Sequence, residues 1–336
     1  MARISLKDIA KAAGVSVTTV SFVINNKARE KRISEQVVEK VNKLIREKNF
    51  TPNTIARGLR TGKSTSLGLI VEDIGNHFFG NVAKTIEMTA YKKGYKVLYS
   101  STDNSEKKAR ELLDMMKNQQ VDGYIITPTK GMKSAIAQLK KEKKPFVLFD
   151  RYFPDLETNY VVLDNFKGAY DMTEFLIGKG YRKIAFVTIL NGMNQMQNRK
   201  QGFKKAIIDK GKGKVEGLVL ELPYEITAEG NLDRLNEFME SHPEVDALFF
   251  ATNYLGILGI QYTLRKQLSI PDDIALVSFD DHDLFRLQKI RITVVAQPIE
   301  KMAAEAIDIL MKLMAGEPSA LMQKTISPEI LIRDSA

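Results

Sequence analysis

The chain has 336 residues, of which 44% are hydrophobic and 27% charged, which is enough for two or three domains with real cores. It contains no cysteine, which excludes disulfides, thiolate chemistry and cysteine-ligated zinc. Residues 1–63 contain 14 Lys and Arg against 5 Asp and Glu, so the net charge of +9 lies in this segment, because the remaining residues contain 36 of each sign. This concentration favours a small module that neutralises phosphates.

The N-terminus lacks the apolar run of a signal peptide, and no apolar stretch approaches the length of a membrane span. We therefore expect a cytoplasmic protein that does not contact a membrane.

Three short helices are expected in residues 1–50. The first has apolar residues at helical spacing, a cap at Ser5 and a turn at Gly14. The second follows a cap at Ser16 and covers residues 17–25, and the third covers 34–48. Two helices joined by a glycine-containing turn form a helix-turn-helix.

The second helix is the candidate recognition helix. Its short polar and apolar side chains can hydrogen-bond base edges or pack on a thymine methyl, and basic residues around it can contact phosphates. The alternative is a small helical domain with a solvated basic face. The candidate DNA contacts in this head are Ser5, Lys7, Ser16, Val17, Thr18, Thr19, Ser21, Phe22, Asn25 and Arg32.

Residues 51–63 read as a short helix that begins after Pro52 and would be marginal in isolation. Together with Val-Ser-x-x-Thr-Val-Ser at 15–21, this segment resembles the lactose-repressor/galactose-repressor (LacI/GalR) family. The resemblance implies that 51–63 is a hinge helix, that two such helices pair in the minor groove, and that Leu59 wedges into a base step. The hinge contacts it implies are Asn53, Ala56, Arg57 and Leu59.

Two positions depart from the family pattern. Phe22 stands where many members carry an arginine, and the guanine contact of that arginine is lost. Gly58 weakens the hinge helix by about 1 kcal/mol relative to alanine. The operator sequence therefore cannot be taken from a relative.

From Leu67 onward, apolar strands alternate with amphipathic helices, which predicts parallel sheets with helices on both faces. There are too many strands for one sheet. The expected strands are 67–71, 96–100, 123–127, 146–149, 160–163, 184–188, 218–222, 247–251 and 275–279.

The family resemblance extends over this region, through Phe149-Asp150-Arg151 and Phe279-Asp280-Asp281 among other segments. It implies an all-α helix-turn-helix head on an α/β, two-lobed core similar to periplasmic binding proteins, with a ligand between the lobes. The domains would be 1–50, the hinge 51–63, and the core 64–336. The first lobe would cover about 64–161 and 291–322, and the second about 162–290 and 323–336.

Ligands of parallel α/β sheets bind beyond the carboxyl ends of the strands. Aromatic faces there can stack on a sugar, while Asp, Asn, Arg and Gln can pair with vicinal hydroxyls. The candidate ligand contacts are Asn76, Phe78, Phe79, Thr127, Asp150, Arg151, Gln195, Arg199, Asn253, Asp280 and Gln297. All except Thr127 and Gln195 also match the sugar-contact pattern of ribose-binding relatives.

Simpler roles stay open for several of these residues. Asp150 and Arg151 could form a structural ion pair, the two phenylalanines could belong to the core, and Asn253 could cap a helix. Tyr254 stands where relatives usually have aspartate, and Tyr224 is a further stacking candidate.

We expect a homodimer that binds a pseudo-palindromic operator and a sugar effector, with no cofactor or metal. An enzyme is disfavoured because the three histidines lie far apart in sequence and 58–64 is one residue short of a phosphate-binding loop. A secreted sugar-binding protein would lack the head. The remaining alternative is a DNA binder that ignores ligands or answers to a protein partner.

Overall fold

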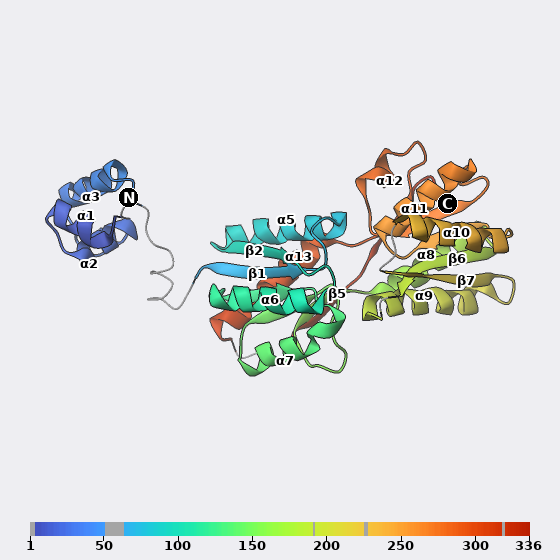
Figure 1. The fold of residues 1–336 in the computed structure, drawn as a ribbon, viewed down its shortest axis with the longest axis horizontal. Coiled ribbons are helices and arrows are strands. Elements are labelled where there is room, and N and C mark those ends of the chain that lie inside the picture. The colour runs from blue at the N-terminus through green and yellow to red at the C-terminus, as the bar shows by residue number, and fades with distance from the viewer. Residues whose placement is uncertain (1–3, 51–63, 191, 225–227, 318–319) are drawn as a thin grey trace. The chain divides into compact units, whose positions relative to one another are not determined.

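A computed structural model describes residues 4–50, 64–190, 192–224, 228–317 and 320–336 (Figure 1). The chain divides into two compact units, Met1–Ser64 and Thr65–Ala336. The hinge residues Asn53, Ala56, Arg57 and Leu59 lie outside the described residues.

The first unit contains the three expected helices, α1 (Leu6–Ala13), α2 (Val17–Ile24) and α3 (Glu35–Glu47). Ser5 and Asp8 form a reciprocal capping box at the start of α1, and Gly14 ends it in the left-handed conformation at φ 70°. Ile9, Val20 and Val41, one from each helix, are fully buried in a shared core. The predicted helix-turn-helix is thereby confirmed.

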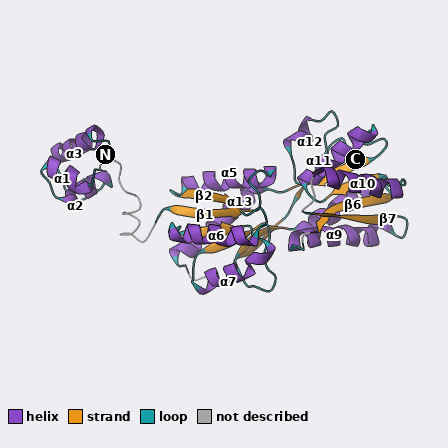
Figure 2. Cartoon of the chain, viewed as in Figure 1, coloured by secondary structure: helices purple, strands orange, loops and turns teal. Residues whose placement is uncertain are grey.

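The second unit contains two lobes, each built on a six-stranded sheet. Figure 2 shows the strands of each lobe lying between helices. In the first lobe the sheet order is β11-β5-β4-β3-β1-β2. Its strands are β1 (Ser66–Val71), β2 (Lys96–Ser101), β3 (Gly123–Ile126), β4 (Phe146–Phe149), β5 (Tyr160–Leu163) and β11 (Gln323–Ile326), and its helices are α5 (His77–Lys92), α6 (Glu106–Asn118), a short 3₁₀ turn (Lys130–Met132), α7 (Lys133–Lys141) and α13 (Ile299–Ala315).

The second lobe repeats this arrangement in the order β12-β10-β9-β8-β6-β7. Every strand pair in the two sheets is parallel except β10 with β12, among the described residues. Its strands are β6 (Lys183–Leu190), β7 (Glu216–Pro223), β8 (Ala247–Phe250), β9 (Ala275–Phe279), β10 (Thr293–Ala296) and β12 (Glu329–Leu331), and its helices are α8 (Asn165–Lys179), α9 (Asn194–Gly211), α10 (Ala228–Ser241), α11 (Asn253–Lys266) and α12 (Asp283–Leu287).

Successive side chains along a strand point to opposite faces of the sheet, so each strand contributes apolar side chains to the helix layers on both faces. In β1, Leu67, Leu69 and Val71 pack with α5 and α13, whereas Ile70 joins the cluster under α6 and α7. In β6, Phe186 faces α8 and α9, and its neighbours along the strand face the other helix pair.

The chain crosses between the lobes three times, after β5, after β10 and after β11. The expected lobe limits were therefore wrong in detail. Strand 293–296 was assigned to the first lobe but pairs with β9 in the second, and strand 323–326 was assigned to the second lobe but pairs with β5 in the first. Residues 160–163 also lie wholly in the first lobe's sheet. The position of these short strands depends on pairing with strands that are distant in sequence, and a local sequence pattern does not reveal such pairing.

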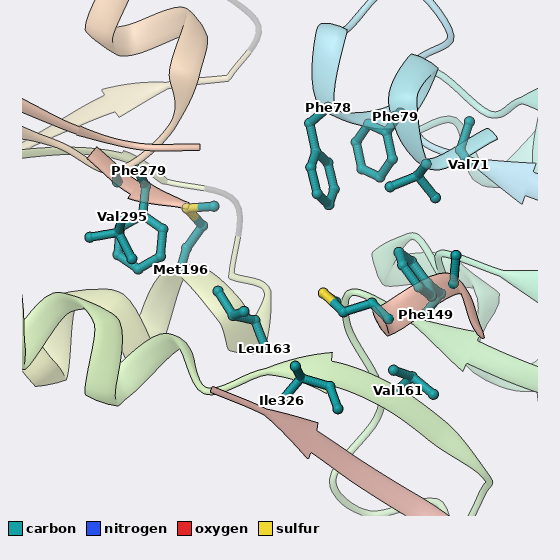
Figure 3. Packing of buried hydrophobic residues seen from close by; sticks show 14 of the residues in the cluster. Val71, Phe78, Phe79, Phe149, Val161, Leu163, Met196, Phe279, Val295 and Ile326 are labelled. Carbon is teal, nitrogen blue, oxygen red and sulfur yellow. The ribbon is translucent and has the colours of Figure 1, made fainter. Parts of the chain in front are cut away.

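One buried hydrophobic cluster continues from lobe to lobe. In Figure 3, Phe78, Phe79 and Phe149 of the first lobe face Met196 and Phe279 of the second. Leu163 and Ile326, the last residues of two crossing strands, lie between them. The polar cleft described next therefore lies beside an apolar floor that both lobes share.

Candidate functional site

A cleft between the lobes gathers ten of the eleven candidate ligand residues. Because the strands of each lobe are parallel, apart from β12, their carboxyl ends meet at one edge, and the two edges face each other. The cleft is lined by Glu72, Asn76, Phe78, Phe79, Asp150, Arg151, Gln195, Met196, Arg199, Thr252, Asn253, Tyr254, Asp280 and Gln297.

Two aspartates occupy equivalent positions in the two lobes. Asp150 follows β4 and Asp280 follows β9, the corresponding strands of the two sheet orders. Both have the left-handed backbone, at φ 67° and 64°. Aspartate tolerates this conformation better than most residues, and it turns each carboxylate out of the strand at its end.

Arg151 is the centre of a buried charge network in the first lobe. Its Nε donates to Asp150 at 3.1 Å, and its Nη2 donates to Glu72. Burial raises the pKa of Asp150, a shift that Arg151 and Arg199 only partly oppose. Burial acts in the same direction on Glu72, but Arg151, together with hydrogen bonds from Tyr224 and Asn104, outweighs it and holds the pKa of Glu72 below its ordinary value.

Arg199 is the buried arginine that the second lobe contributes, from α9, and it is 2% exposed. Its Nε donates to Asn165 Oδ1 at 2.7 Å, and its Nη1 donates to the carbonyl of Ala251 at 2.5 Å. The same Nη1 lies 3.6 Å from Asp280, and the guanidinium lies 3.9 Å above the Phe279 ring. The side chain is thus fixed on several sides before any ligand contacts it.

Polar contacts connect the two lobes directly across the cleft. The hydroxyl of Tyr224, after β7, donates to Glu72, after β1, at 2.8 Å. Burial and this carboxylate raise the pKa of Tyr224, so the phenol keeps its proton and remains a donor. Asn253 and Asn76 also approach each other, with 3.5 Å between their side-chain amides.

One histidine from each lobe makes a further contact between the lobes. The rings of His77, the first residue of α5, and His282, the cap of α12, have centroids 4.3 Å apart. Burial, and next the neighbouring His77, lower the pKa of His282. Separation in sequence had concealed this contact. Within the described ranges, no group of three His, Asp or Glu side chains is arranged to hold a metal ion.

Three buried polar atoms of the cleft have no hydrogen-bond partner among the described residues: Arg151 Nη1, Gln195 Oε1 and Gln297 Oε1. Such atoms are costly unless something pairs with them. The space between the lining side chains is only about 40 Å³, close to the volume of one water molecule. A groove of about 650 Å³ adjoins it and shares Phe78, Asp280 and Gln297. A sugar therefore needs the lobes or the cleft side chains to move before it can enter.

The candidate residue Thr127 does not line the cleft. It is 1% exposed and enclosed in the first lobe, where its backbone N–H donates to the carbonyl oxygen of Ile70 in β1. Two of the simpler roles prove real, because Asp150 and Arg151 do form an ion pair and Phe78 and Phe79 belong to the buried core. Asn76, for which no such role was expected, caps α5. The cap of α11, however, is Thr252, and Asn253 is its first residue.

Sequence reasoning missed Glu72, Met196 and Thr252 as lining residues. The strand-end rule could have found Glu72, which directly follows β1, and Thr252, which comes two residues after β8. Tyr254, noted only as a departure from the family, also lines the cleft.

The head presents most of its candidate DNA contacts to solvent. Ser5, Lys7, Ser16, Val17, Thr18 and Arg32 are exposed, whereas Thr19, Ser21, Phe22 and Asn25 are half-buried. Some of these side chains stabilise the helix itself. Ser16 accepts from the backbone N–H of Thr19 at 3.0 Å, and Asn25 donates to the carbonyl of Ser21 at 2.7 Å. Phe22 lies under Lys31, with 5.7 Å between the ammonium and the ring.

Both units match known families. Residues 5–53 match bacterial regulatory proteins of the lacI family, and residues 173–336 match the periplasmic binding protein-like domain. The chain is 31% identical to the HTH-type transcriptional regulator DegA of Bacillus subtilis over 335 residues, which cover 98% of this chain and 97% of DegA. It is 30% identical to the ribose operon repressor of Halalkalibacterium halodurans over 331 residues, which cover 98% and 96%.

Among solved structures, the lac repressor dimer bound to operator and the anti-inducer ONPF has a TM-score of 0.86 to this chain. It is 20% identical, and the alignment covers 99% of each chain. This likeness concerns the fold, and it confirms the expected helix-turn-helix head with a two-lobed α/β core. No helix in the described part of the chain is long and apolar enough to cross a membrane.

Proposed function

This chain belongs to the lacI family of bacterial regulatory proteins, and on that basis we propose that it is a repressor whose affinity for operator DNA is controlled by a sugar or sugar derivative. The regulatory role belongs to the family, since DegA and the ribose operon repressor are transcription regulators that match almost the whole chain. Like them, the protein acts on DNA and is not an enzyme, and its place is the bacterial cytoplasm.

The observation that carries the ligand proposal is the convergence of ten candidate residues in one cleft. They come from both lobes, and they combine buried aromatic rings with carboxylates, guanidiniums and amides. Vicinal hydroxyls match such a set because each hydroxyl both donates and accepts. Arg151 Nη1, Gln195 Oε1 and Gln297 Oε1 supply one donor and two acceptors that still need partners.

The ligand would act by changing how the lobes are held together. A sugar that pairs with Arg151 on one lobe and Gln195 on the other adds a cross-lobe connection to the Glu72–Tyr224 contact. Binding energy that differs between lobe arrangements shifts the population towards one of them. In the proposed homodimer, this shift reaches the operator through residues 51–63, which pair in the minor groove.

The operator should be pseudo-palindromic, because each subunit of the proposed dimer supplies one recognition helix and one hinge segment. The predicted head contacts Ser16, Val17, Thr18 and Ser21 read the bases, and Lys7 and Arg32 contact phosphates. The hinge residue Leu59 inserts at the centre of the site.

The test begins with DNA selected by the full-length protein from a random duplex library. Affinity for the selected site is then measured by fluorescence anisotropy with and without each member of a panel of sugars at millimolar concentration. We expect an imperfect palindrome and at least one sugar that changes the affinity. Selection of no preferred sequence would refute the repressor proposal.

A second candidate is a repressor that ignores small ligands or answers to a protein partner, and the small volume of the cleft favours it. Thermal unfolding in the same sugar panel separates the two, since a ligand that binds only the folded protein raises its melting temperature. Absence of any change in both melting temperature and operator affinity would favour the second candidate.

A further inference from the structure

The charges that line the cleft are already paired within the protein. Three carboxylates (Glu72, Asp150 and Asp280) face two guanidiniums (Arg151 and Arg199), and all five residues are buried, although the Glu72 side chain keeps 12% of its surface exposed. Of the described residues lining the cleft, none is a lysine. The formal charge of this set is therefore −1, and each guanidinium has at least one carboxylate beside it.

Glu72 is the residue that makes this set net negative, because the two aspartates alone would balance the two guanidiniums. Without it, Arg151 would share only the carboxylate of Asp150, whose own pKa burial raises. With it, both Nη2 and Nε of the guanidinium are committed to carboxylates. Glu72 is also held from the other lobe by the Tyr224 hydroxyl, so its carboxylate is fixed in the cleft from two sides.

Arg199 is likewise engaged within the protein. Its Nε and Nη1 donate to Asn165 and to the carbonyl of Ala251, its face lies on Phe279, and Asp280 lies beside it. An incoming carboxylate or phosphate would meet Asp280 at close range, and burying like charges together is strongly unfavourable.

We propose that the effector is an uncharged polyhydroxyl compound and that Glu72 determines this specificity by excluding sugar acids and sugar phosphates. This inference rests on the proposed function, because it concerns the ligand of the same cleft. It adds the charge class of that ligand and names the residue that selects it.

The atoms without partners favour the same class. Arg151 Nη1 needs an acceptor, whereas Gln195 Oε1 and Gln297 Oε1 each need a donor. A hydroxyl group can fill either role. An oxygen of a carboxylate or of a phosphate dianion can only accept a hydrogen bond. Such an oxygen beside Gln195 Oε1 or Gln297 Oε1 would leave that amide oxygen without a donor.

The test compares matched ligand pairs that differ in charge. Full-length protein is titrated by calorimetry with D-glucose against D-glucuronate, D-galactose against D-galacturonate, and D-ribose against D-ribose 5-phosphate. We expect at least one neutral sugar to bind, and its anionic counterpart to bind at least about 100-fold more weakly, as the cost of a buried like-charge contact implies.

Glu72→Gln keeps the shape of the side chain and removes its charge. This variant should bind the anionic sugar of a pair more tightly, so the ratio of the two affinities within the pair should shrink by at least about tenfold. The control Glu106→Gln removes a carboxylate from an exposed pair with Arg110 and should leave the difference unchanged. The double variant Glu72→Gln/Arg151→Gln also removes the guanidinium, so its affinity for anionic sugars should not rise above that of wild type.

The outcomes separate the two proposals. If an anionic sugar binds wild type as tightly as its neutral partner, the charge inference fails while the sugar-controlled repressor stands. If no compound of either class binds or shifts operator affinity, the proposed function itself fails. If a folded Glu72→Gln variant still favours neutral over anionic sugars as strongly as wild type does, Glu72 does not determine the specificity. Should that variant not fold, a gain of anion binding by the double variant would still overturn the proposed role, because no freed guanidinium could explain it.

Discussion

Replacing Arg199 by methionine should destabilise the core strongly, because the guanidinium holds several buried groups at once. The change removes the hydrogen bonds to Asn165 and Ala251 and the contact with the Phe279 ring. It also removes the only cation that lies within 4 Å of Asp280 in the described part of the chain. Asp280 is 7% exposed and would keep a buried charge without its partner. Breaking a buried pair in this way costs about 3–5 kcal/mol.

The assay is thermal unfolding of the full-length protein followed by circular dichroism. Since a unit of 150–250 residues loses about 2–4 °C per kcal/mol, the core transition should fall by on the order of 10 °C. Adding Asp280→Asn to Arg199→Met removes the stranded charge and should recover a substantial part of this loss. The control Arg265→Met removes an exposed arginine, 3.5 Å from Glu229, and should lower the transition by less than about 4 °C.

The reasoning would be refuted if Arg199→Met unfolded within a few degrees of wild type. It would also be refuted if Asp280→Asn added a further loss instead of a recovery. Either result would mean that the charge network around Arg199 does not contribute to the stability of the core.

Three further predictions concern helix packing, pH and DNA. A Cβ at Gly202 would lie 2.2 Å from the carbonyl oxygen of Phe166, so Gly202→Ala should destabilise the core by about 1–3 kcal/mol. At the control position Gly178 a Cβ would meet open space, so Gly178→Ala should stabilise the core by up to about 1 kcal/mol. Equal melting temperatures of the two variants would contradict the close approach of α8 and α9. Because the folded-state pKa of His282 is lowered, the unfolded chain binds the proton first, and the core loses stability as pH falls below about 6.5. The variant His282→Asn can still cap α12, and its melting temperature should drop less between about pH 7.5 and 5.5 than that of wild type. A drop as large as that of wild type would count against the histidine pair. In operator titrations, Lys7→Ala should reduce the salt slope by about one, while Thr18→Ala should weaken sequence preference at an unchanged slope; the reverse pattern would exchange their roles.

Local signals were sufficient for the head and for the nine long or strongly apolar strands. Caps such as Ser5 and Gly14 act on their own helix, and alternation or helical periodicity depends on neighbours within a few residues. The strand-end rule then located ten of the cleft residues, because parallel strands must bring their carboxyl ends to one edge. Thr127 shows the limit of that rule, since a residue at the right strand end can still be enclosed.

The sequence by itself determined the fold class, the charged DNA-binding head and the residue types of the cleft, because composition, charge and periodicity are properties of the chain before it folds. Only the tertiary structure decided how those residues are paired. It placed the β10 and β11 strands in the lobes opposite to those expected, brought Glu72 against Arg151 and Tyr224, and joined His77 to His282. Each of these contacts joins segments far apart along the chain, and packing between lobes, which no local pattern encodes, selects them.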